Sequence, residues 1–252
     1  MAHSLLELCQ AERGLICAVG AGGKKSLLLR LATAHPGPVG LTATVPIALP
    51  PRHGLRCLVE QDGDRMVEAV SVALDQGESR LVFAAPPPKP GRLGGLEPEL
   101  VQQIHDLGGF KATLVKADGA RMLALKAPEA WEPVCPKNTT TVLAVLSASV
   151  IGEPLSERIA HRIERVEAVC GIRRGDPLTP EALARLMTSE EGLLKGCGSA
   201  SVVPVINMVD DEARLARART LAIQALNQTG RFDKVVLTCL RAEDPVVDVV
   251  ER

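Results

Sequence analysis

The sequence contains no tyrosine, and it has only one tryptophan and three phenylalanines among its 252 residues. Proteins that bind single-stranded nucleic acid stack successive bases on aromatic side chains. So few rings argue against such a platform. Neither sign of charge is in excess, because 29 lysines and arginines face 30 aspartates and glutamates. We therefore expect no nucleic acid, other polyanion or membrane surface among the partners of this protein.

The seven cysteines form no disulfide or zinc-binding pattern, because they are odd in number and no two are spaced as C-x-x-C. No apolar run approaches the roughly 20 residues that span a bilayer. The first 14 residues also lack the basic region and long apolar core of a secretory signal. These absences predict a soluble, cytoplasmic protein.

Alanine, valine and leucine are abundant, and short β-type apolar runs alternate with helical patterns. This alternation predicts an α/β fold, a mostly parallel sheet with helices on both faces. The predicted strands are 15–19, 39–45, 55–59, 81–85, 112–117, 141–147, 202–206 and 234–239, with an edge strand at 246–250. The predicted helices are 4–12, 26–34, 62–76, 97–107 and 211–228. The segment 153–197 shows no clear strand, and we interpret it as a helical insertion, with one helix marked by Ile159, Ile163 and Val166, in a single domain spanning 1–252.

The stretch 15–29, LICAVGAGGKKSLLL, is typical of a phosphate-binding loop: an apolar strand, a glycine turn, a lysine and a helix. Glycines let backbone N–H groups converge on an anion, the helix N-terminus adds its dipole, and a lysine adds a full charge. The sequence therefore predicts a P-loop NTPase-like fold that binds nucleotide phosphates. The residues assigned to this binding are Gly20, Ala21, Gly22, Gly23, Lys24, Lys25 and Ser26.

This loop departs from the usual G-x-x-x-x-G-K-[ST] pattern in two places. Ala18 stands where the first glycine is expected, and Lys25 stands where a hydroxyl would bind magnesium, with Ser26 one residue later. The alternative is a glycine-rich turn that binds nothing. The preceding strand, the lysine pair and the following helix favour phosphate binding over that alternative.

Asp118 ends an apolar strand and is followed by a glycine. Ligands gather at the carboxyl ends of parallel strands, so Asp118 is predicted to bind Mg²⁺ together with Ser26; taken alone, it reads as an ordinary turn aspartate. Arg121 and Lys126 follow closely, and cations at this place neutralise a bound or transferred phosphate. If the protein is a nucleoside triphosphatase or phosphoryl transferase, the predicted catalytic residues are Lys24, Asp118, Arg121 and Lys126.

Asn207 and Asp210 close a later strand with the spacing N-x-x-D. In GTP-binding proteins the element N-K-x-D recognises the guanine base, so both residues are predicted to contact a nucleotide base. Met208 stands in place of the lysine. An equally good interpretation is a helix cap, in which Asp210 or Asp211 opens the helix 211–228. Both interpretations stay open at this point.

Five ordered motifs together resemble the YqeC family, over roughly residues 12–240. They are VGAGGKKS, the run VKADGARMLALKAPEAWEPVCP (115–136), His161-Arg162, EGLLKG (191–196) and INMVD (206–210). The family is regarded as accessory proteins of selenium-dependent molybdenum hydroxylases. The resemblance implies a protein that binds ATP or GTP with Mg²⁺ and serves maturation of such a hydroxylase or its cofactor.

The chain departs from the family pattern at residues that bear on magnesium and the base. Lys25 replaces a threonine, Lys116 replaces a glutamate and Met208 replaces a lysine. These departures keep two other hypotheses open. One is a phosphoryl or nucleotidyl transferase, or a ligase of the ATP-dependent Mur type, acting on a small cofactor. The other is a non-catalytic scaffold or cofactor carrier.

Overall fold

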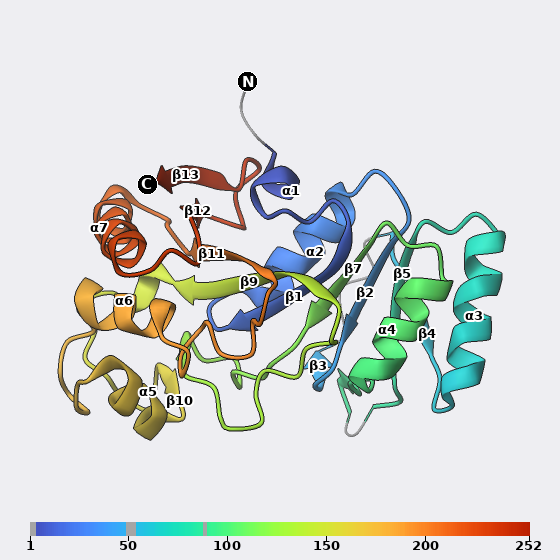
Figure 1. Cartoon of the computed structure of the whole chain (residues 1–252), viewed down its shortest axis with the longest axis horizontal. Helices are drawn as coiled ribbons and strands as arrows, with labels where there is room; N and C mark the ends of the chain where they lie inside the picture. The colour runs from blue at the N-terminus through green and yellow to red at the C-terminus, as the bar shows by residue number, and fades with distance from the viewer. Residues whose placement is uncertain (1–3, 49–53, 88–89) are drawn as a thin grey trace. The chain divides into compact units, whose positions relative to one another are not determined.

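The computed structural model describes residues 4–48, 54–87 and 90–252, and it is an α/β fold built on a mostly parallel nine-stranded sheet (Figure 1). The strand order is β13-β12-β11-β9-β1-β7-β2-β5-β4. β13 stands at the end of this order, so it is the predicted edge strand, and it pairs with β12 in the antiparallel sense. The α/β class and the mostly parallel sheet are thus confirmed. The nine strands are β1 Gly14–Gly20, β2 Val39–Ala43, β4 Arg56–Val59, β5 Arg80–Ala84, β7 Ala112–Lys116, β9 Thr139–Ser147, β11 Ser201–Asn207, β12 Lys234–Thr238 and β13 Val246–Glu251.

Four short strands form two small pairs outside this sheet. They are β3 Ile47–Ala48 with β6 Arg92–Leu93, and β8 Leu125–Lys126 with β10 Ala160–His161. The helices in the described part of the chain are α1 Leu5–Leu8, α2 Lys24–Ala34, α3 Gly63–Asp75, α4 Pro98–Leu107, α5 Ile163–Cys170, α6 Pro180–Thr188 and α7 Glu212–Gln228, with a 3₁₀ turn at Ala148–Val150.

Two sequence predictions about helices were wrong in detail. The first helix is one turn long, because Gln10 has a φ of 48° and cannot continue it. The helix predicted from Ile159, Ile163 and Val166 begins only at Ile163, directly after Arg162 at a φ of 63°. Ile159 precedes β10, a two-residue strand too short to leave an alternating pattern in the sequence.

The described residues fall into two compact units that interleave along the chain. The first comprises the described residues up to Ala18, those between Lys25 and Gly119, and Val134–Thr141; the second comprises Val19–Lys24, Ala120–Pro133 and Val142–Arg252. The single domain spanning 1–252 stays a prediction.

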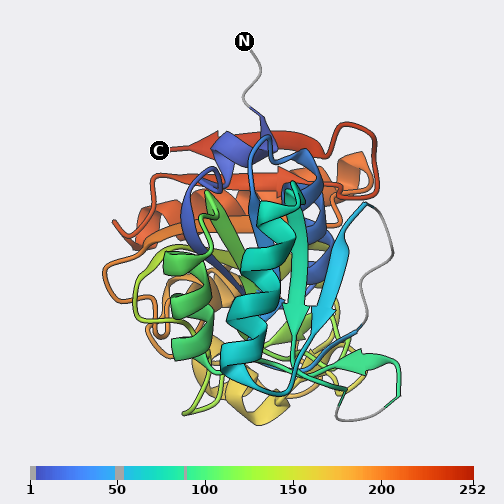
Figure 2. The same cartoon turned by 90° about the vertical axis from the view of Figure 1, so that its right-hand side faces the viewer.

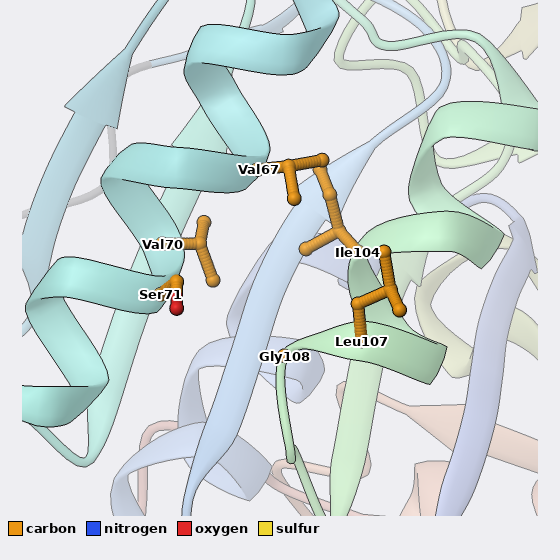
Figure 3. Close-up of a pocket in the computed structure, with 6 residues that line it drawn as sticks. All are labelled: Val67, Val70, Ser71, Ile104, Leu107 and Gly108. Atoms are coloured by element: carbon orange, nitrogen blue, oxygen red, sulfur yellow. The ribbon is translucent and has the colours of Figure 1, made fainter.

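The first unit holds parallel strand pairs, among them β1 with β7, β2 with β7 and β2 with β5. Helices α3 and α4 lie side by side in this unit (Figure 2). A small cleft between them is shown in Figure 3. Its lining is Val67, Val70, Ser71, Ile104, Leu107 and Gly108. The lining is apolar except for one hydroxyl, so it offers no converging polar groups that would orient a ligand.

The second unit packs α6 against both α5 and α7, and it pairs β11 with β12 in parallel. Asp211 caps α7, since its side chain accepts a hydrogen bond from the Arg214 amide at 2.8 Å. Of the two aspartates that the sequence offered as caps, Asp211 therefore is the cap. Across the described helices of both units, none has the length and apolar character needed to cross a membrane.

The thiol of Cys170, in α5, provides a first test of this packing. Burial raises the pKa of Cys170 to about 12, although the nearby Arg185 lowers it. Only the thiolate reacts with alkylating reagents, so at pH 8 Cys170 is expected to react about a thousandfold or more slowly than the exposed Cys57. Mass spectrometry of iodoacetamide-labelled protein at successive times measures both rates. Equal rates would contradict the packing of α5.

Candidate functional site

The glycine loop, residues Gly20–Lys24, connects β1 to α2 and lies in the second unit. Gly20, Gly22 and Gly23 have φ values of 88°, 92° and 134°, a region that favours glycine. The loop also leaves no room for side chains at these positions. A Cβ at Gly20 would lie 2.2 Å from the Val145 carbonyl oxygen, and one at Gly22 would lie 2.6 Å from Cβ of Ser147. Conformation and packing therefore both require glycine.

Hydrogen bonds at Gly20, Ala21 and Gly22 hold this loop in place. The Ala21 amide donates to the Val145 carbonyl at 2.9 Å, and Nδ2 of Asn207 donates to the Gly22 carbonyl at 2.7 Å. The ammonium of Lys24 folds back onto the Gly20 carbonyl, and its side chain is buried. The loop is thus tied to β9 and to Asn207 at the end of β11.

Asn207 is buried, and both the nitrogen and the oxygen of its side-chain amide form hydrogen bonds. Its Oδ1 accepts hydrogen bonds from Oγ1 of Thr238 and from the Leu240 amide, each at 3.2 Å. The side chain therefore joins the end of β12 to the glycine loop. The sequence predicted Asn207 as a contact to a base, and the structure places it beside the predicted phosphate loop.

The side chains of Met208 and Asp210 also form polar contacts within the second unit. Asp210 forms an ion pair with Arg214 at 2.8 Å and accepts from Sγ of Cys239 at 3.2 Å. Met208 has a φ of 65°, and its sulfur accepts from Oγ of Ser147 at 3.1 Å. A non-glycine residue in this region is strained, and such strain concentrates at functional sites.

Lys25, Ser26 and Asp118 belong to the first unit. Lys25 and Ser26 lie in the first turn of α2, where Lys25 is half-buried and Ser26 is exposed. Asp118 follows β7 and is buried. Within residues 4–48, 54–87 and 90–252, no three His, Cys, Asp or Glu side chains gather to hold a metal ion. Binding of Mg²⁺ by Ser26 and Asp118 stays a prediction.

A second cluster in the second unit surrounds the carboxylate of Glu132. Lys126 lies on β8, and its Nζ is 2.7 Å from Oε2 of Glu132. Nη1 of Arg162 binds the same oxygen, and the amide of Glu129 lies 3.4 Å from it. The side chains of Lys126 and Glu132 are both buried, so this is a buried ion pair with a second cation.

The segment that carries this cluster also exposes large side chains. Trp131 is 69% exposed, and the guanidinium carbon of Arg162 lies 5.5 Å from the centroid of its ring, a cation–π contact. Arg121 is exposed at a φ of 47°, and Met122 follows at a φ of 66° and is 92% exposed. Sequence reasoning assigned roles to Arg121 and Lys126 but missed Glu132, Arg162 and Trp131, although all three lie in motifs that carried the family resemblance.

The pKa of His161 depends on the charges of this cluster. Burial lowers the pKa of His161, and the positive charges of Arg162, Arg121 and Lys126 lower it further. The carboxylate of Glu132 offsets this only in part. The potential at His161 is therefore positive.

This shift predicts a pH dependence of stability. Between the lowered pKa of His161 and the ordinary value of 6.5, the unfolded chain binds a proton that the native protein does not. Stability is thus expected to be highest above pH 6.5 and to fall as the pH falls through this window. The urea midpoint of the wild type should drop more between pH 7.5 and 5.5 than that of His161→Gln. An equal drop of the urea midpoint in the two proteins would contradict the lowered pKa of His161.

The glycine loop and the 115–136 segment lie in a part of the chain that matches a known family. The model of the YqeC protein family matches residues 16–164. The chain is 28% identical over 189 residues to "Uncharacterized protein YqeC" of Escherichia coli (strain K12), covering 74% of this chain and 72% of that protein. No solved structure matches the chain significantly. The P-loop NTPase-like part of the fold prediction therefore stays a prediction.

Proposed function

The chain belongs to the YqeC family, and from that premise we propose that it is a nucleotide-binding protein whose glycine loop holds the phosphates of GTP or ATP. The observation that carries the proposal is the conformation of Gly20–Gly23. Three glycines with positive φ are fixed between a buried strand and the first turn of a helix, ahead of Lys24. Such a turn presents backbone N–H groups to an anion at a helix N-terminus.

Asn207 supports the proposal as a positioning residue. Its bond to the Gly22 carbonyl fixes the loop before any ligand arrives, which lowers the entropic cost of binding. Asp210 is the candidate for a base contact, since its carboxylate is partly exposed at the end of the same segment. In the complex, the carboxylate of Asp210 would bind both the guanidinium of Arg214 and the base. Ser26 and Asp118 remain the proposed ligands of an accompanying Mg²⁺.

Calorimetric titration with GTP and ATP, with and without Mg²⁺, tests the proposal. We expect at least one nucleotide to bind, and Lys24→Met to weaken that binding at least tenfold, because the lysine supplies the full positive charge at the loop. Arg173→Gln removes an exposed charge elsewhere in the second unit and should leave binding unchanged. Heat signals absent for both nucleotides, with an unchanged melting temperature, would refute nucleotide binding.

We further propose that nucleotide binding serves maturation of a selenium-dependent molybdenum hydroxylase. The family resemblance supports this step, and the geometry of the loop is neutral toward it. Deletion of the gene in its host should lower the activity of such a hydroxylase, and re-expression of the wild type should restore it. If a variant that binds no nucleotide also restored the hydroxylase activity, the role in maturation would not depend on nucleotide binding.

Lys25 motivates a second candidate, a scaffold that binds nucleotide without turning it over. This residue occupies the position of the magnesium-binding hydroxyl. Under this hypothesis Lys25→Thr should raise the rate of GTP or ATP hydrolysis on the order of tenfold, because a metal ligand stabilises the charge that develops on the phosphates. A phosphate-release assay measures it. Efficient turnover by the parent protein would exclude the scaffold.

A further inference from the structure

We propose that Arg121, Trp131 and Arg162, supported by Lys126 and Glu132, form a second ligand site in the second unit, which binds a planar aromatic compound carrying a phosphate or carboxylate group. This site is separate in its residues from the glycine loop, and it does not depend on nucleotide binding there. Four kinds of observation carry it: the charges, an open hydrogen-bond donor, the exposed ring and the backbone conformation.

The charges around the site are positive on balance. Arg121, Lys126 and Arg162 stand against two carboxylates, Glu129 and Glu132. His161 is adjacent: besides burial, the charges of the three cations lower its pKa, and the carboxylate of Glu132 raises it less. A ligand anion would be stabilised in such a field.

Arg162 has a donor left for this anion. Its Nη1 binds Glu132 and its Nε lies 3.7 Å from Glu129, whereas Nη2 has no hydrogen-bond partner among the residues that the structure describes. Glu132 fixes the guanidinium from one side, so the free nitrogen keeps a defined direction. Planar guanidinium groups held in this way recognise phosphate and carboxylate oxygens.

The aromatic part of the ligand follows from Trp131. A tryptophan is usually well buried, yet this indole is 69% exposed while the guanidinium of Arg162 lies 5.5 Å from its ring centroid. The cation–π contact fixes the ring beside the anion-binding nitrogen. A flat ligand can therefore stack on the indole and place its charged group at Arg162 and Arg121.

The backbone is strained at the same place. Of the five non-glycine residues with positive φ in the described part of the chain, three belong to this cluster or its loop: Arg121, Met122 and Arg162. Such conformations persist only where the surroundings fix them, and they concentrate at ligand sites and catalytic centres. This observation is independent of the charges and of the exposed ring.

Trp131 also reports binding, because it is the single tryptophan in a chain without tyrosine. The test is a fluorescence titration of the full chain with phenyl phosphate, inorganic phosphate and phenol. We expect saturable quenching by phenyl phosphate, with an affinity at least tenfold above those of inorganic phosphate and phenol. Each of the two weaker probes carries only one of the two recognised features.

Variants separate this site from the glycine loop. Arg121→Gln should weaken phenyl phosphate at least fivefold; its side chain is exposed, so folding should be kept. Arg173→Gln is the control at another exposed arginine of the same unit, and Lys24→Met should leave the fluorescence titration unchanged while it weakens nucleotide binding. Unsaturable quenching, equal affinity for phenol, or insensitivity to Arg121→Gln would overturn the proposal, whatever the outcome for GTP and ATP.

Discussion

Replacement of Glu132 by glutamine is expected to lower the free energy of unfolding by about 3–5 kcal/mol, the cost of removing one partner from a buried ion pair. The carboxylate of Glu132 binds both Lys126 and Arg162, and the side chain of Lys126 has no exposed area. Glutamine keeps the size of the side chain but removes its charge. Two cations would then share a neutral amide, and one of them is shielded from water.

Glu129→Gln is the matched control for this change. Glu129 belongs to the same loop and faces the same arginine at 3.7 Å, but its side chain is 28% exposed. A partly exposed pair at this distance contributes about 0–1 kcal/mol, so the loss should be small. Urea unfolding followed by circular dichroism measures both variants. Similar losses for the two glutamates would contradict the assignment of Glu132 as the centre of the cluster.

Replacement of Gly20 by alanine is expected to destabilise the protein by about 2–5 kcal/mol, from the strain of a positive φ together with overpacking. Gly20 has a φ of 88°, and an added Cβ would lie 2.2 Å from the Val145 carbonyl oxygen. That oxygen also accepts the Ala21 amide, so the contact cannot relax without loss of a loop hydrogen bond. Nucleotide affinity should fall with it.

Gly175→Ala separates the two contributions. Gly175 has nearly the same φ, 90°, and a Cβ there would meet no heavy atom within 4 Å. Only the conformational cost of about 1–2 kcal/mol should appear, and nucleotide binding should be unchanged. Chemical denaturation of both variants, followed by calorimetry with GTP and ATP, checks the pair. Equal losses of stability at Gly20 and Gly175 would show that contact with Val145 is unimportant.

The sequence predicted those features that depend on residues close together in the chain. The buried strands appear as apolar runs ending in glycine or polar residues. The glycines within residues 20–23 likewise indicate a turn whose backbone conformation favours glycine. The role of Asn207 was harder to predict from the sequence. Its strand-end position was predicted, but the bond to the Gly22 carbonyl joins residues 185 positions apart.

The Glu132 cluster could not be assembled from the sequence for a similar reason. It depends on the pairing of β8 with β10, two residues each, which places His161 opposite Lys126. Pairing this short leaves no periodicity to read. Trp131 and Arg162 were visible as residues of a recognised motif, yet their contact needs that pairing and the positive φ of Arg162.

The central claim is that the glycine loop binds nucleotide phosphates, and the backbone amides of that loop test it most directly. In ¹⁵N-edited NMR spectra, addition of GTP or ATP with Mg²⁺ should shift the amide signals of Ala21, Gly22, Gly23 and Lys24 more than those of any other segment. The shifts should be lost in Lys24→Met. Loop amides that stay unmoved at saturating concentrations of both nucleotides would contradict the claim.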